Sequence, residues 1–388
     1  MLDPAAGSAA RRRVLVAHPS AELYGSDRVM LESLEGFVAA GWRVLVALPG
    51  PGPLVAEVSS RGGLVVYCPS PVLRKSALRP AGFLRLLADA ARGFGSGLRL
   101  LRRARPEVMY VSTLTIPLWL LLARLTGCRT VCHVHEAEGS ASVRLRRLLA
   151  APLFAADTIV ANSEFSRQVL GSAFQSLGAR TSVVYNGVPG PPTVPATRES
   201  IVEPVRLVYV GRLSERKGVD VAVSAVAELI RRGTAAELDI VGSVFTGYEW
   251  YEAELVDQVN RLGLRDRVRL RGFENPVWPR LVAADIALVP SRWDEPFGNT
   301  AVEAVLAGRP LIASDSSGLR EAVADFESVI RVPPGDAGAI AEAVQSMLGR
   351  WPDYSRRARS DAVAAARRFG PPRYRTRITS ILRQTSDG

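Results

Sequence analysis

Short runs of apolar, mostly β-branched residues alternate along the chain with longer amphipathic stretches. Within each run the apolar positions are largely continuous, which is typical of parallel strands buried on both faces of a sheet. Helical patterns such as 26–40 and 217–232 fall between the runs. Because this series occurs twice, we expect an α/β protein with two doubly wound, Rossmann-like domains. The expected strands lie at 13–18, 43–48, 64–68, 107–111, 129–135, 157–161, 181–185, 206–211, 238–242, 267–271, 285–290, 309–313 and 328–332.

A proline-rich segment separates the two series. It reads PGPPTVPATRESIVEP, and because proline removes a hydrogen-bond donor from helix and sheet alike, we expect a connector between domains. A last helical pattern follows the final pair of prolines, and two-domain α/β proteins often return such a helix to the first domain. The predicted organisation is a disordered N-terminus at 1–12, a first domain at 13–188, a linker at 189–204, a second domain at 205–370 and a returning C-terminal helix at 371–388.

The composition is that of a globular intracellular protein. A chain of 388 residues with 47% hydrophobic content can bury more than one core. Cys68, Cys128 and Cys132 cannot build a disulfide framework, so we expect reduced thiols and a cytoplasmic location. We expect no signal peptide, because no apolar block with a cleavage site follows the first arginines. The longest uncharged run, 108–123, is shorter than the ~20 apolar residues that a membrane helix needs.

The net charge of +11 lies almost entirely in the first half of the chain. Residues 1–188 carry 22 Lys and Arg against 12 Asp and Glu, a net of +10. The stretch 74–105 is a basic amphipathic pattern, which we expect Gly93, Gly95 and Gly97 to interrupt. Such a segment can lie on the anionic inner face of a membrane, or it can present a solvated charged face. Nucleic acid is the remaining partner class, but no nucleic-acid motif is present and aromatic residues are sparse among these charges.

The segment most informative about chemistry is PSRWDEPFGNTAVEAVLAGRP in the second half. A strand is expected to end at its first residue, and a helix to begin near Asn299 or Thr300, after a loop that carries Glu295 and Gly298. Amides at a helix start attract an anion, and glycine lets a ligand approach the backbone. Glu303 lies one turn inside the helix, where a carboxylate can accept hydrogen bonds from a ribose diol. The group suits a nucleotide sugar; the alternative is a pair of surface carboxylates.

Two other turns between a strand and a helix carry candidate phosphate ligands. In RLVYVGRLSERKG, Arg212 and Lys217 can neutralise a diphosphate, and arginine can do so with two hydrogen bonds. In HPSAELYGSDR, Gly25 and Ser26 place backbone amides at a helix start. The alternatives are solvated loop cations in the first turn and an ordinary connection in the second.

Two of the three histidines end the strand at 129–135. His133 and His135 project to the same side because they are two residues apart. One of them can contact a reacting sugar, whereas the alternative is a buried, satisfied histidine. A zinc site that also uses Cys128 and Cys132 is not expected, because four ligands on one strand cannot surround a metal.

Together these segments resemble glycosyltransferase family 4, the retaining nucleotide-sugar transferases of the GT-B architecture, in which two Rossmann-like domains face each other across a cleft. The resemblance covers about 13–350, and the motifs stand in the family's order. The spacing of Glu295 and Glu303 is the most specific, because Pro-Phe-Gly and Glu-Ala surround the two carboxylates. The motifs are Tyr24-Gly25-Ser26-Asp27-Arg28, His135-Glu136, Asn162-Ser163-Glu164-Phe165, Tyr185-Asn186-Gly187-Val188, Gly211-Arg212 with Lys217-Gly218, and Glu295-x7-Glu303.

The resemblance implies a donor site in the second domain. Arg212 and Lys217 would bind the donor diphosphate, Glu303 would accept from the ribose hydroxyls, and Glu295 would hold the transferred sugar. The backbone of 297–300 would meet sugar and phosphate. The implied donor-binding residues are Arg212, Lys217, Glu295, Phe297, Gly298, Asn299, Thr300 and Glu303.

The resemblance also implies that His135 lies beside the anomeric carbon, with His133 as its substitute if the strand register differs. The implied catalytic set is His135 with Glu295, Arg212 and Lys217. The chain departs from the family at two places. Gly25-Ser26 stands in the acceptor or phosphate loop where many members have two glycines, and Ser317 stands where a glycine is usual.

We therefore expect a retaining glycosyltransferase that moves a sugar from a nucleotide diphosphate sugar to a hydroxyl acceptor held by the first domain. The basic first domain favours a lipid-linked or polysaccharide precursor as acceptor. Since Arg212 and Lys217 would take the place of a metal, the resemblance implies no divalent cation and no other cofactor. The alternatives are a nucleotide-sugar epimerase of the same architecture, a basic nucleic-acid-binding protein and a catalytically inactive nucleotide-sugar binder.

Overall fold

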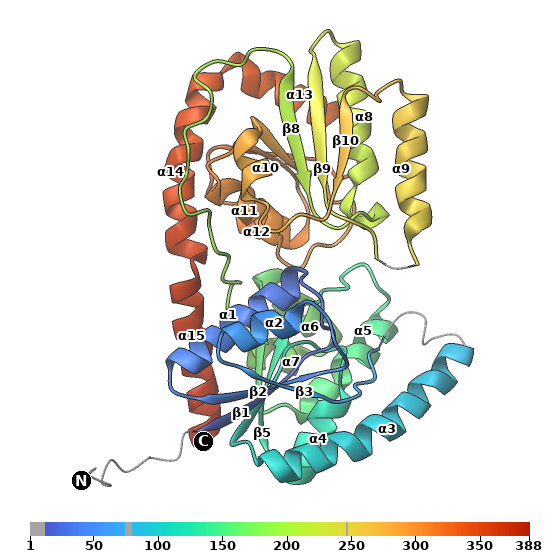
Figure 1. Cartoon of the computed structure of the whole chain (residues 1–388), viewed down its shortest axis with the longest axis vertical. Coiled ribbons are helices and arrows are strands. Elements are labelled where there is room, and N and C mark those ends of the chain that lie inside the picture. The colour runs from blue at the N-terminus through green and yellow to red at the C-terminus, as the bar shows by residue number, and fades with distance from the viewer. Residues whose placement is uncertain (1–11, 74–79, 246) are drawn as a thin grey trace, which may run out of the picture. The chain divides into compact units, whose positions relative to one another are not determined.

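The computed structural model describes residues 12–73, 80–245 and 247–388 (Figure 1). The chain divides into two compact units: Met1–Gly187 with Pro371–Gly388 form the first, and Val188–Gly370 form the second. Each unit contains one sheet whose neighbouring strands all pair in parallel. This confirms the predicted fold class. The N-terminal residues predicted to be disordered lie, apart from Arg12, outside the described residues.

The sheet of the first unit has the order β3-β2-β1-β4-β5-β6-β7. The order reverses at β1, so β1 lies between β2 and β4, and the loops after β1 and β4 leave the sheet side by side. The strands are β1 (Arg13–Ala17), β2 (Arg43–Leu48), β3 (Leu64–Tyr67), β4 (Val108–Val111), β5 (Arg129–Val134), β6 (Thr158–Ala161) and β7 (Thr181–Val183).

Helices cover both faces of this sheet, and the alternation of side chains along each strand divides the core in two. Val16 and Tyr110 pack on one face against α1 and α15, whereas Leu15 and Met109 pack on the other against α4 and η2. The helices of this unit are α1 (Gly25–Ala39), α2 (Leu54–Ser60), α3 (Pro80–Ala104), α4 (Leu118–Thr126), α5 (Val143–Ala150), η2 (Ala151–Ala155), α6 (Glu164–Ala173), α7 (Gln175–Arg180) and α15 (Pro371–Asp387).

The C-terminal helix α15 is part of the first unit's core. It packs closely on α1, where a Cβ added at Gly36 would lie 3.1 Å from the Cβ of Arg375. The Arg375 guanidinium also pairs with Glu32 and Glu35 of α1, each at 2.6 Å. Ile378 is fully buried between these elements. The last residues of the chain therefore complete a core that begins with the first strand.

Helix α3 is continuous from Pro80 to Ala104, so the predicted interruption at its three glycines is wrong. At two of these glycines, the neighbouring segments leave no room for a side chain. A Cβ at Gly93 would lie 2.8 Å from the backbone oxygen of Pro69, and one at Gly97 would lie 2.5 Å from Leu122 of α4. The helix tolerates the poor helix propensity of glycine because the close approach of α4 stabilises it. Within the described residues, no helix is both long and apolar enough to cross a bilayer.

The sheet of the second unit has the order β10-β9-β8-β11-β12-β13, which reverses at β8. Its strands are β8 (Val205–Val210), β9 (Ala236–Val241), β10 (Val268–Gly272), β11 (Ile286–Val289), β12 (Leu311–Ser314) and β13 (Val329–Val332). Its helices are η3 (Glu215–Lys217), α8 (Val219–Arg231), α9 (Glu249–Arg261), α10 (Trp278–Ala283), α11 (Asn299–Leu306), α12 (Ser317–Val323), α13 (Ala337–Gly349) and α14 (Trp351–Phe369).

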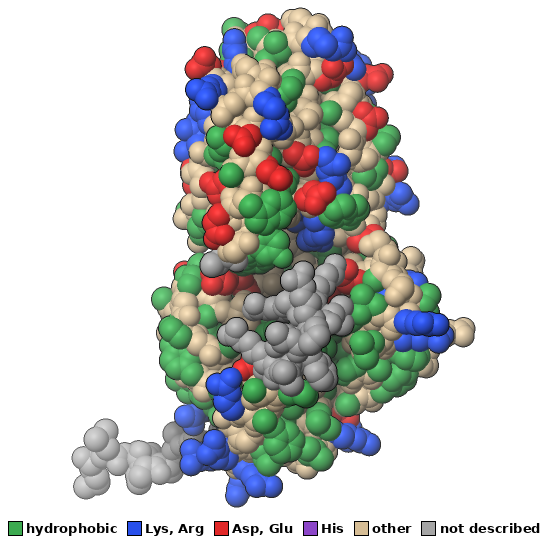
Figure 2. Space-filling view, turned by 90° about the vertical axis from the view of Figure 1, so that its right-hand side faces the viewer, with side chains coloured by type: hydrophobic (Ala, Val, Ile, Leu, Met, Phe, Trp, Pro, Cys, Tyr) green, Lys and Arg blue, Asp and Glu red, His purple; other side chains and the backbone are tan. Residues whose placement is uncertain are grey.

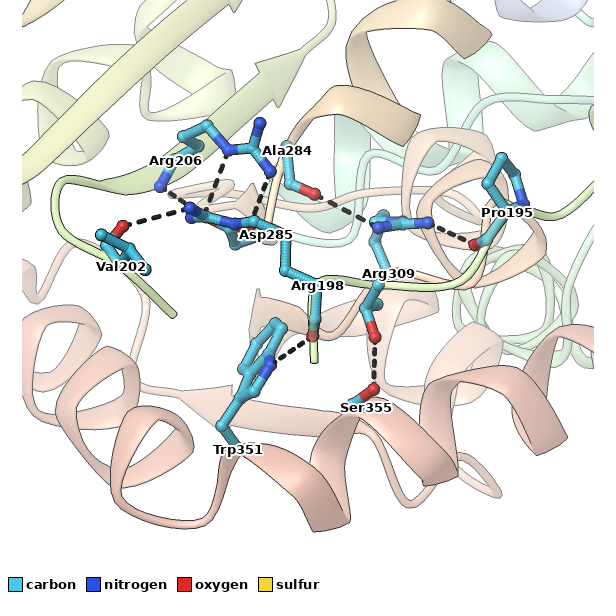
Figure 3. A network of polar contacts seen from close by, with 10 residues as sticks. Pro195, Arg198, Val202, Arg206, Ala284, Asp285, Arg309, Trp351 and Ser355 are labelled. Carbon is cyan, nitrogen blue, oxygen red and sulfur yellow. Dashed lines mark hydrogen bonds and ion pairs between the residues drawn. The ribbon is translucent and has the colours of Figure 1, made fainter. Parts of the chain in front are cut away.

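The proline-rich segment predicted as a linker is fastened to the second unit by a polar network (Figure 3). Asp285 is buried, and it accepts hydrogen bonds from the guanidinium groups of Arg198 and Arg206. Burial alone would raise the pKa of Asp285, but these hydrogen bonds outweigh it and lower the pKa. The buried Arg309 donates to the Pro195 oxygen at 2.6 Å, and the Trp351 indole donates to the Arg198 oxygen at 2.8 Å. From Pro195 onward this segment belongs to the surface of the second unit.

Candidate functional site

In the second unit, the expected donor residues gather where β8 and β11 end. These strands are neighbours in the sheet, so the loops after their carboxyl ends meet. Lys217 ends η3 in the first loop, and Glu295 lies in the second. The Lys217 Nζ donates to the Glu295 Oε2 at 2.5 Å, and the Ser291 hydroxyl donates to the same oxygen at 3.3 Å. The structure thus brings two of the expected residues into direct contact.

The Lys217–Glu295 pair is sheltered from water, since the two side chains are only 17% and 9% exposed. Burial lowers the pKa of Lys217, and the attraction of Glu295 offsets this only in part. For Glu295, burial alone would raise the pKa, but the attraction of Lys217 and Arg216 outweighs it and lowers the pKa. Glu295 is therefore held as a carboxylate by the cations around it.

Arg212 lies at the carboxyl end of β8, beside the loop that follows β9. Its guanidinium carbon is 3.4 Å from the ring centroid of Phe245, a stacked cation–π contact. The Tyr209 hydroxyl donates to the Arg212 oxygen at 2.7 Å. A Cβ at Gly242 would lie 1.9 Å from the oxygen of Gly211, so glycine is required where the two loops touch. The position of Arg212 is thus fixed by backbone contacts and by an aromatic ring that sequence reasoning did not single out.

The segment from Phe297 to Thr300 turns the chain into α11. The Phe297 side chain is buried against the Phe369 ring, with ring centroids 5.5 Å apart, so it anchors the loop from inside. Gly298 has φ +104°, and a Cβ there would also lie 2.4 Å from Leu319. Helix α11 begins at the next residue, and Glu303 is buried one turn further along. In this turn Phe297 and Gly298 are buried, whereas Asn299 and Thr300 are partly exposed.

A neighbouring turn at the start of α12 supports the loop that carries Glu295. Ser317 has φ +44°, a conformation that favours glycine, and its hydroxyl donates to Asp294 Oδ1 at 3.0 Å. The Gly318 N–H donates to the Glu295 oxygen at 2.9 Å, and a Cβ at Gly318 would lie 2.3 Å from the Pro296 oxygen. The residue that departs from the family pattern therefore keeps the glycine-like backbone and adds a hydrogen bond.

In the first unit, His18, His133 and His135 form one group at the ends of β1 and β5. The rings of His133 and His135 have centroids 4.0 Å apart. His18 approaches Ser112 Oγ with Nδ1 at 2.5 Å and Asp27 Oδ1 with Nε2 at 2.6 Å. These are the chain's only histidines, and sequence reasoning overlooked His18. Its place directly after the first strand, at the reversal of strand order, was the signal that could have found it.

The buried Asp27 holds the loop that contains Gly25 and Ser26 in place through hydrogen bonds. The Asp27 carboxylate accepts from the Tyr24 N–H at 2.7 Å and from the Ser20 hydroxyl at 2.8 Å. Gly25 begins α1, and both Gly25 and Ser26 are exposed. Asp27 is buried, so its other partner, His18, links this exposed turn to the histidine group.

Glu136 fixes the backbone next to the histidine group, at His135 and Leu114. Its carboxylate accepts from the His135 N–H at 3.0 Å, from the Leu114 N–H at 3.4 Å and from the Thr113 hydroxyl. Burial raises the pKa of Glu136, and these hydrogen bonds counteract the increase in part. Among the described residues, no group of three or more His, Cys, Asp or Glu is placed to hold a metal ion.

His133 in β5 and His135 directly after it are uncharged over a wide pH range. His133 is fully buried, and although His135 is partly exposed as a residue, its Nε2 atom is buried. Burial, with a smaller contribution from His18, lowers the pKa of His135 to about 3, and burial also lowers the pKa of His133. A neutral imidazole at this position can accept or donate one hydrogen bond without adding positive charge.

The depressed histidine pKa values predict that the first unit loses stability in mild acid. Below the ordinary pKa of 6.5 the unfolded chain binds protons that folded His133 and His135 do not, so stability falls from pH 6.5 toward 3. The expected slope is about 1.4 kcal/mol per pH unit for each histidine. Unfolding by urea at pH 7.5 and 5.0 measures it. His135→Asn should flatten the slope because it removes one of the two histidines, whereas the raised pKa of Glu136, which acts in the opposite direction, is common to both proteins. Equal stability at the two pH values would contradict the assignment.

The strained backbone of Ser317 predicts an order of stability for two substitutions. Ser317→Gly removes the hydrogen bond to Asp294 but relieves the left-handed conformation, whereas Ser317→Ala removes the bond and keeps the strain. We expect Ser317→Gly to be more stable than Ser317→Ala by about 1 kcal/mol. Chemical unfolding of the two variants side by side measures the difference, and an alanine variant as stable as the glycine variant would show that the position carries no strain.

Comparison with known proteins identifies both units. Residues 24–189 match the family model described as Glycosyltransferase Family 4, and residues 204–350 match that described as Glycosyl transferases group 1. The glycogen synthase of Mycobacterium tuberculosis is 29% identical over 287 residues, which are 68% of this chain and 67% of that protein. The D-inositol 3-phosphate glycosyltransferase 2 of Catenulispora acidiphila is 35% identical over 237 residues, which are 56% and 53% of the two chains.

Solved structures show the same fold. Anabaena HepE in complex with UDP-glucose has a TM-score of 0.80 and 20% identity, and the match covers 96% of this chain and 99% of HepE. The match extends over both units, each with its own parallel sheet and covering helices. The chain is therefore a glycosyltransferase with a family 4 domain at 24–189 and a group 1 domain at 204–350, and it has the GT-B architecture.

Proposed function

We propose that this glycosyltransferase uses a nucleotide diphosphate sugar as its donor and retains the configuration of the transferred sugar. The buried pair of Lys217 and Glu295 is the observation that carries the proposal. A cation and a carboxylate in one sheltered place match the two parts of such a donor, because the cation attracts the diphosphate and the carboxylate accepts hydrogen bonds from sugar hydroxyls. The structure of HepE, which has the same fold, contains UDP-glucose, and this supports the donor class.

The surroundings of this pair suit the remaining parts of the donor. Arg212 stands at the end of the neighbouring strand β8 and can share the charge of the diphosphate with Lys217. The amides of 298–300 at the start of α11 can donate to phosphate or sugar oxygens. Glu303, buried one turn further on, is assigned to the ribose hydroxyls. The protein's own cations would meet the diphosphate's charge, so we expect transfer without an added divalent metal.

The proposed reaction is a substitution on one face of the sugar. The bond between the anomeric carbon and the diphosphate oxygen breaks, and the acceptor oxygen bonds to the same face, so the configuration is retained. The acceptor's proton passes to an oxygen of the departing diphosphate. Arg212 and Lys217 stabilise the negative charge that develops on this leaving group. Neutral His135, assigned to the side of the anomeric carbon, adds no positive charge where the sugar itself becomes positive.

We further propose that the acceptor is lipid-linked or a growing polysaccharide, and that the first unit meets it on an anionic membrane surface. Leu121 and Leu125 of α4, Leu148 of α5 and Phe154 of η2 are each about half or more exposed, and α4 and α5 both pack on η2. Exposed arginines such as Arg124 accompany them. Figure 2 shows apolar and basic side chains beside one another on the surface of the first unit. Apolar contact and attraction to anionic headgroups act together on such a surface.

Substitution of Lys217 tests the donor site. The chain has only one other lysine, Lys75, among its 49 Lys and Arg residues, so the effect of each lysine can be measured separately. Lys217→Ala removes the cation beside the diphosphate, so we expect turnover to fall by about 10²–10³-fold while the fold survives. Lys217→Arg should also be impaired, since the lysine is nearly buried and a guanidinium does not fit the place of an ammonium. Steady-state transfer assays over a panel of nucleotide sugars measure both effects.

Lys75→Arg serves as the matched control and should retain activity. It also leaves Lys217 as the only side-chain amine, so isotopic methylation of the amines gives one lysine signal to follow by NMR. Adding the nucleoside diphosphate alone should shift this signal. Full activity in Lys217→Ala, or a lysine signal that no nucleoside diphosphate shifts, would refute the donor site. Product formation without any acceptor would instead favour an epimerase.

The membrane proposal predicts salt-sensitive binding to vesicles. We expect the protein to float with anionic vesicles at low salt, to float much less with zwitterionic ones, and to detach as salt rises. The double variant Leu121→Glu and Leu125→Glu should weaken flotation because it places two carboxylates in the contact. Val363→Glu, at a similarly exposed position on α14 of the second unit, is the control and should float like the wild type. Flotation that depends on neither lipid charge nor salt would argue against this surface.

A further inference from the structure

A chain of hydroxyl groups connects His133 to the two helices that cover it. The Tyr110 hydroxyl lies 2.6 Å from His133 Nδ1, and the Ser33 hydroxyl of α1 lies 3.1 Å from the Tyr110 hydroxyl. The Tyr374 hydroxyl of α15 lies 2.6 Å from that of Ser33. All four side chains are buried. The proposed function has no use for this network, although it ends beside His135.

We propose that Tyr110 is a positioning residue for His135, and that it acts by holding His133 in one tautomer. The inference rests on the proposed role of His135 in transfer. The ring of His135 packs against that of His133, with centroids 4.0 Å apart and planes tilted by 44°. Tyr110 is the hydrogen-bond partner of His133, and its own ring is wedged edge-on against Phe37 of α1. A change in the His133 ring would therefore be passed to His135 by direct contact.

The hydrogen bonds favour the tautomer of His133 that carries its proton on Nδ1. Ser33 donates its proton to the Val29 oxygen, so its hydroxyl oxygen is left to accept from Tyr374 and Tyr110. The Tyr110 oxygen then accepts from the Nδ1–H of His133. Among the described residues, His133 Nε2 has no hydrogen-bond partner. The opposite tautomer would leave a buried N–H without an acceptor, which is less favourable than a bare lone pair.

A fixed, neutral His133 matters because His135 has no hydrogen-bond partner at Nε2 within the described residues. Its ring is held by packing and by the backbone bond from its N–H to Glu136. If His133 exchanged between tautomers, the surface on which His135 rests would change its polarity. Restricting His133 to one state therefore keeps the His135 ring in one orientation.

Histidine-selective ¹⁵N labelling tests this inference directly, because the tautomer of each of the three histidines can be observed separately by NMR. In the wild type, we expect His133 to show one protonated Nδ1 and one bare Nε2 between pH 6 and 8. Tyr110→Phe removes only the hydroxyl, so we expect His133 to become a mixture of tautomers. Tyr374→Phe is the matched control: it removes a hydroxyl of the same network that does not touch His133, and its ring can still stack on His133 at 6.2 Å. His133 should keep its single tautomer in this control.

Kinetics then show whether the tautomer affects transfer. In Tyr110→Phe we expect kcat to fall by on the order of 10- to 100-fold, with KM for the nucleotide sugar within about 2-fold, because the donor residues lie in the other unit. In Tyr374→Phe, kcat should stay within about 3-fold of the wild type. Because a loss of folded protein would also lower the apparent kcat and leave KM unchanged, kcat is calculated per folded enzyme, with the folded fraction taken from the ¹⁵N spectra. The Tyr374→Phe control then shows the effect of losing a buried hydroxyl that does not contact His133.

The outcomes separate this inference from the proposed function. A mixed or Nε2-protonated His133 in the wild type overturns the inference, whatever the enzyme transfers. A Tyr110→Phe variant with a mixed tautomer but unchanged kcat overturns it as well, as does an equal loss of kcat in Tyr374→Phe. If the wild type transfers no sugar from any donor, the proposed function fails, and the ¹⁵N spectra of the three proteins alone then decide whether Tyr110 fixes His133.

Discussion

The buried ion pair of Lys217 and Glu295 is the interaction on which the second unit's site depends. Removing two opposite charges from water is costly, and here the 2.5 Å contact between them and the Ser291 hydroxyl offset the cost. The pair ties the loop after β8 to the loop after β11. Through the Glu295 backbone it is also tied to the start of α12, where Gly318 donates to Glu295. Most cations of this chain are arginines, but the buried position beside Glu295 is occupied by a lysine, whose compact ammonium group fits there.

The side chains at the strand ends are charged in the second unit, whereas the histidines at the strand ends of the first unit are neutral. At the strand ends of the second unit, Arg212, Lys217 and Glu295 are charged, and the attraction of nearby cations keeps Glu295 ionised. At the strand ends of the first unit, burial keeps His133 and His135 neutral. This division matches the proposed chemistry, since a leaving diphosphate needs positive charge near it and a carbon becoming positive does not. The burial of His133 depends in part on α15, whose Tyr374 ring stacks on the imidazole with centroids 6.2 Å apart.

The strands could be predicted from the sequence because parallel strands buried on both faces need continuous apolar residues. Every expected run forms a strand, with ends that differ by one or two residues. The sequence also singled out Lys217 and Glu295, which meet between the loops after β8 and β11, because both stand in the motifs that resemble the family. What escaped prediction depends on packing between distant segments. Gly97 does not break α3 because Leu122 of α4 fills the space beside it, and no local pattern reveals that contact.

The polar network of the first unit escaped prediction for the same reason. His18, Tyr110 and Ser33 are separated by many residues and meet only because β1, β4 and α1 pack together. The glycine-like turn of Ser317 could not be foreseen either. Its hydroxyl contacts Asp294, and the sequence alone suggested only a departure from the family.

The return of α15 to the first unit has a consequence for how the chain is made. The ribosome synthesises the chain from its N-terminus, yet the core around β1 lacks Tyr374, Ile378 and Leu382 until the last residues emerge. The second unit ends at Gly370 and is complete earlier. The first unit is thus begun before the second and completed after it, and until α15 is made the face of α1 that carries Glu32, Ser33 and Gly36 lacks its partner.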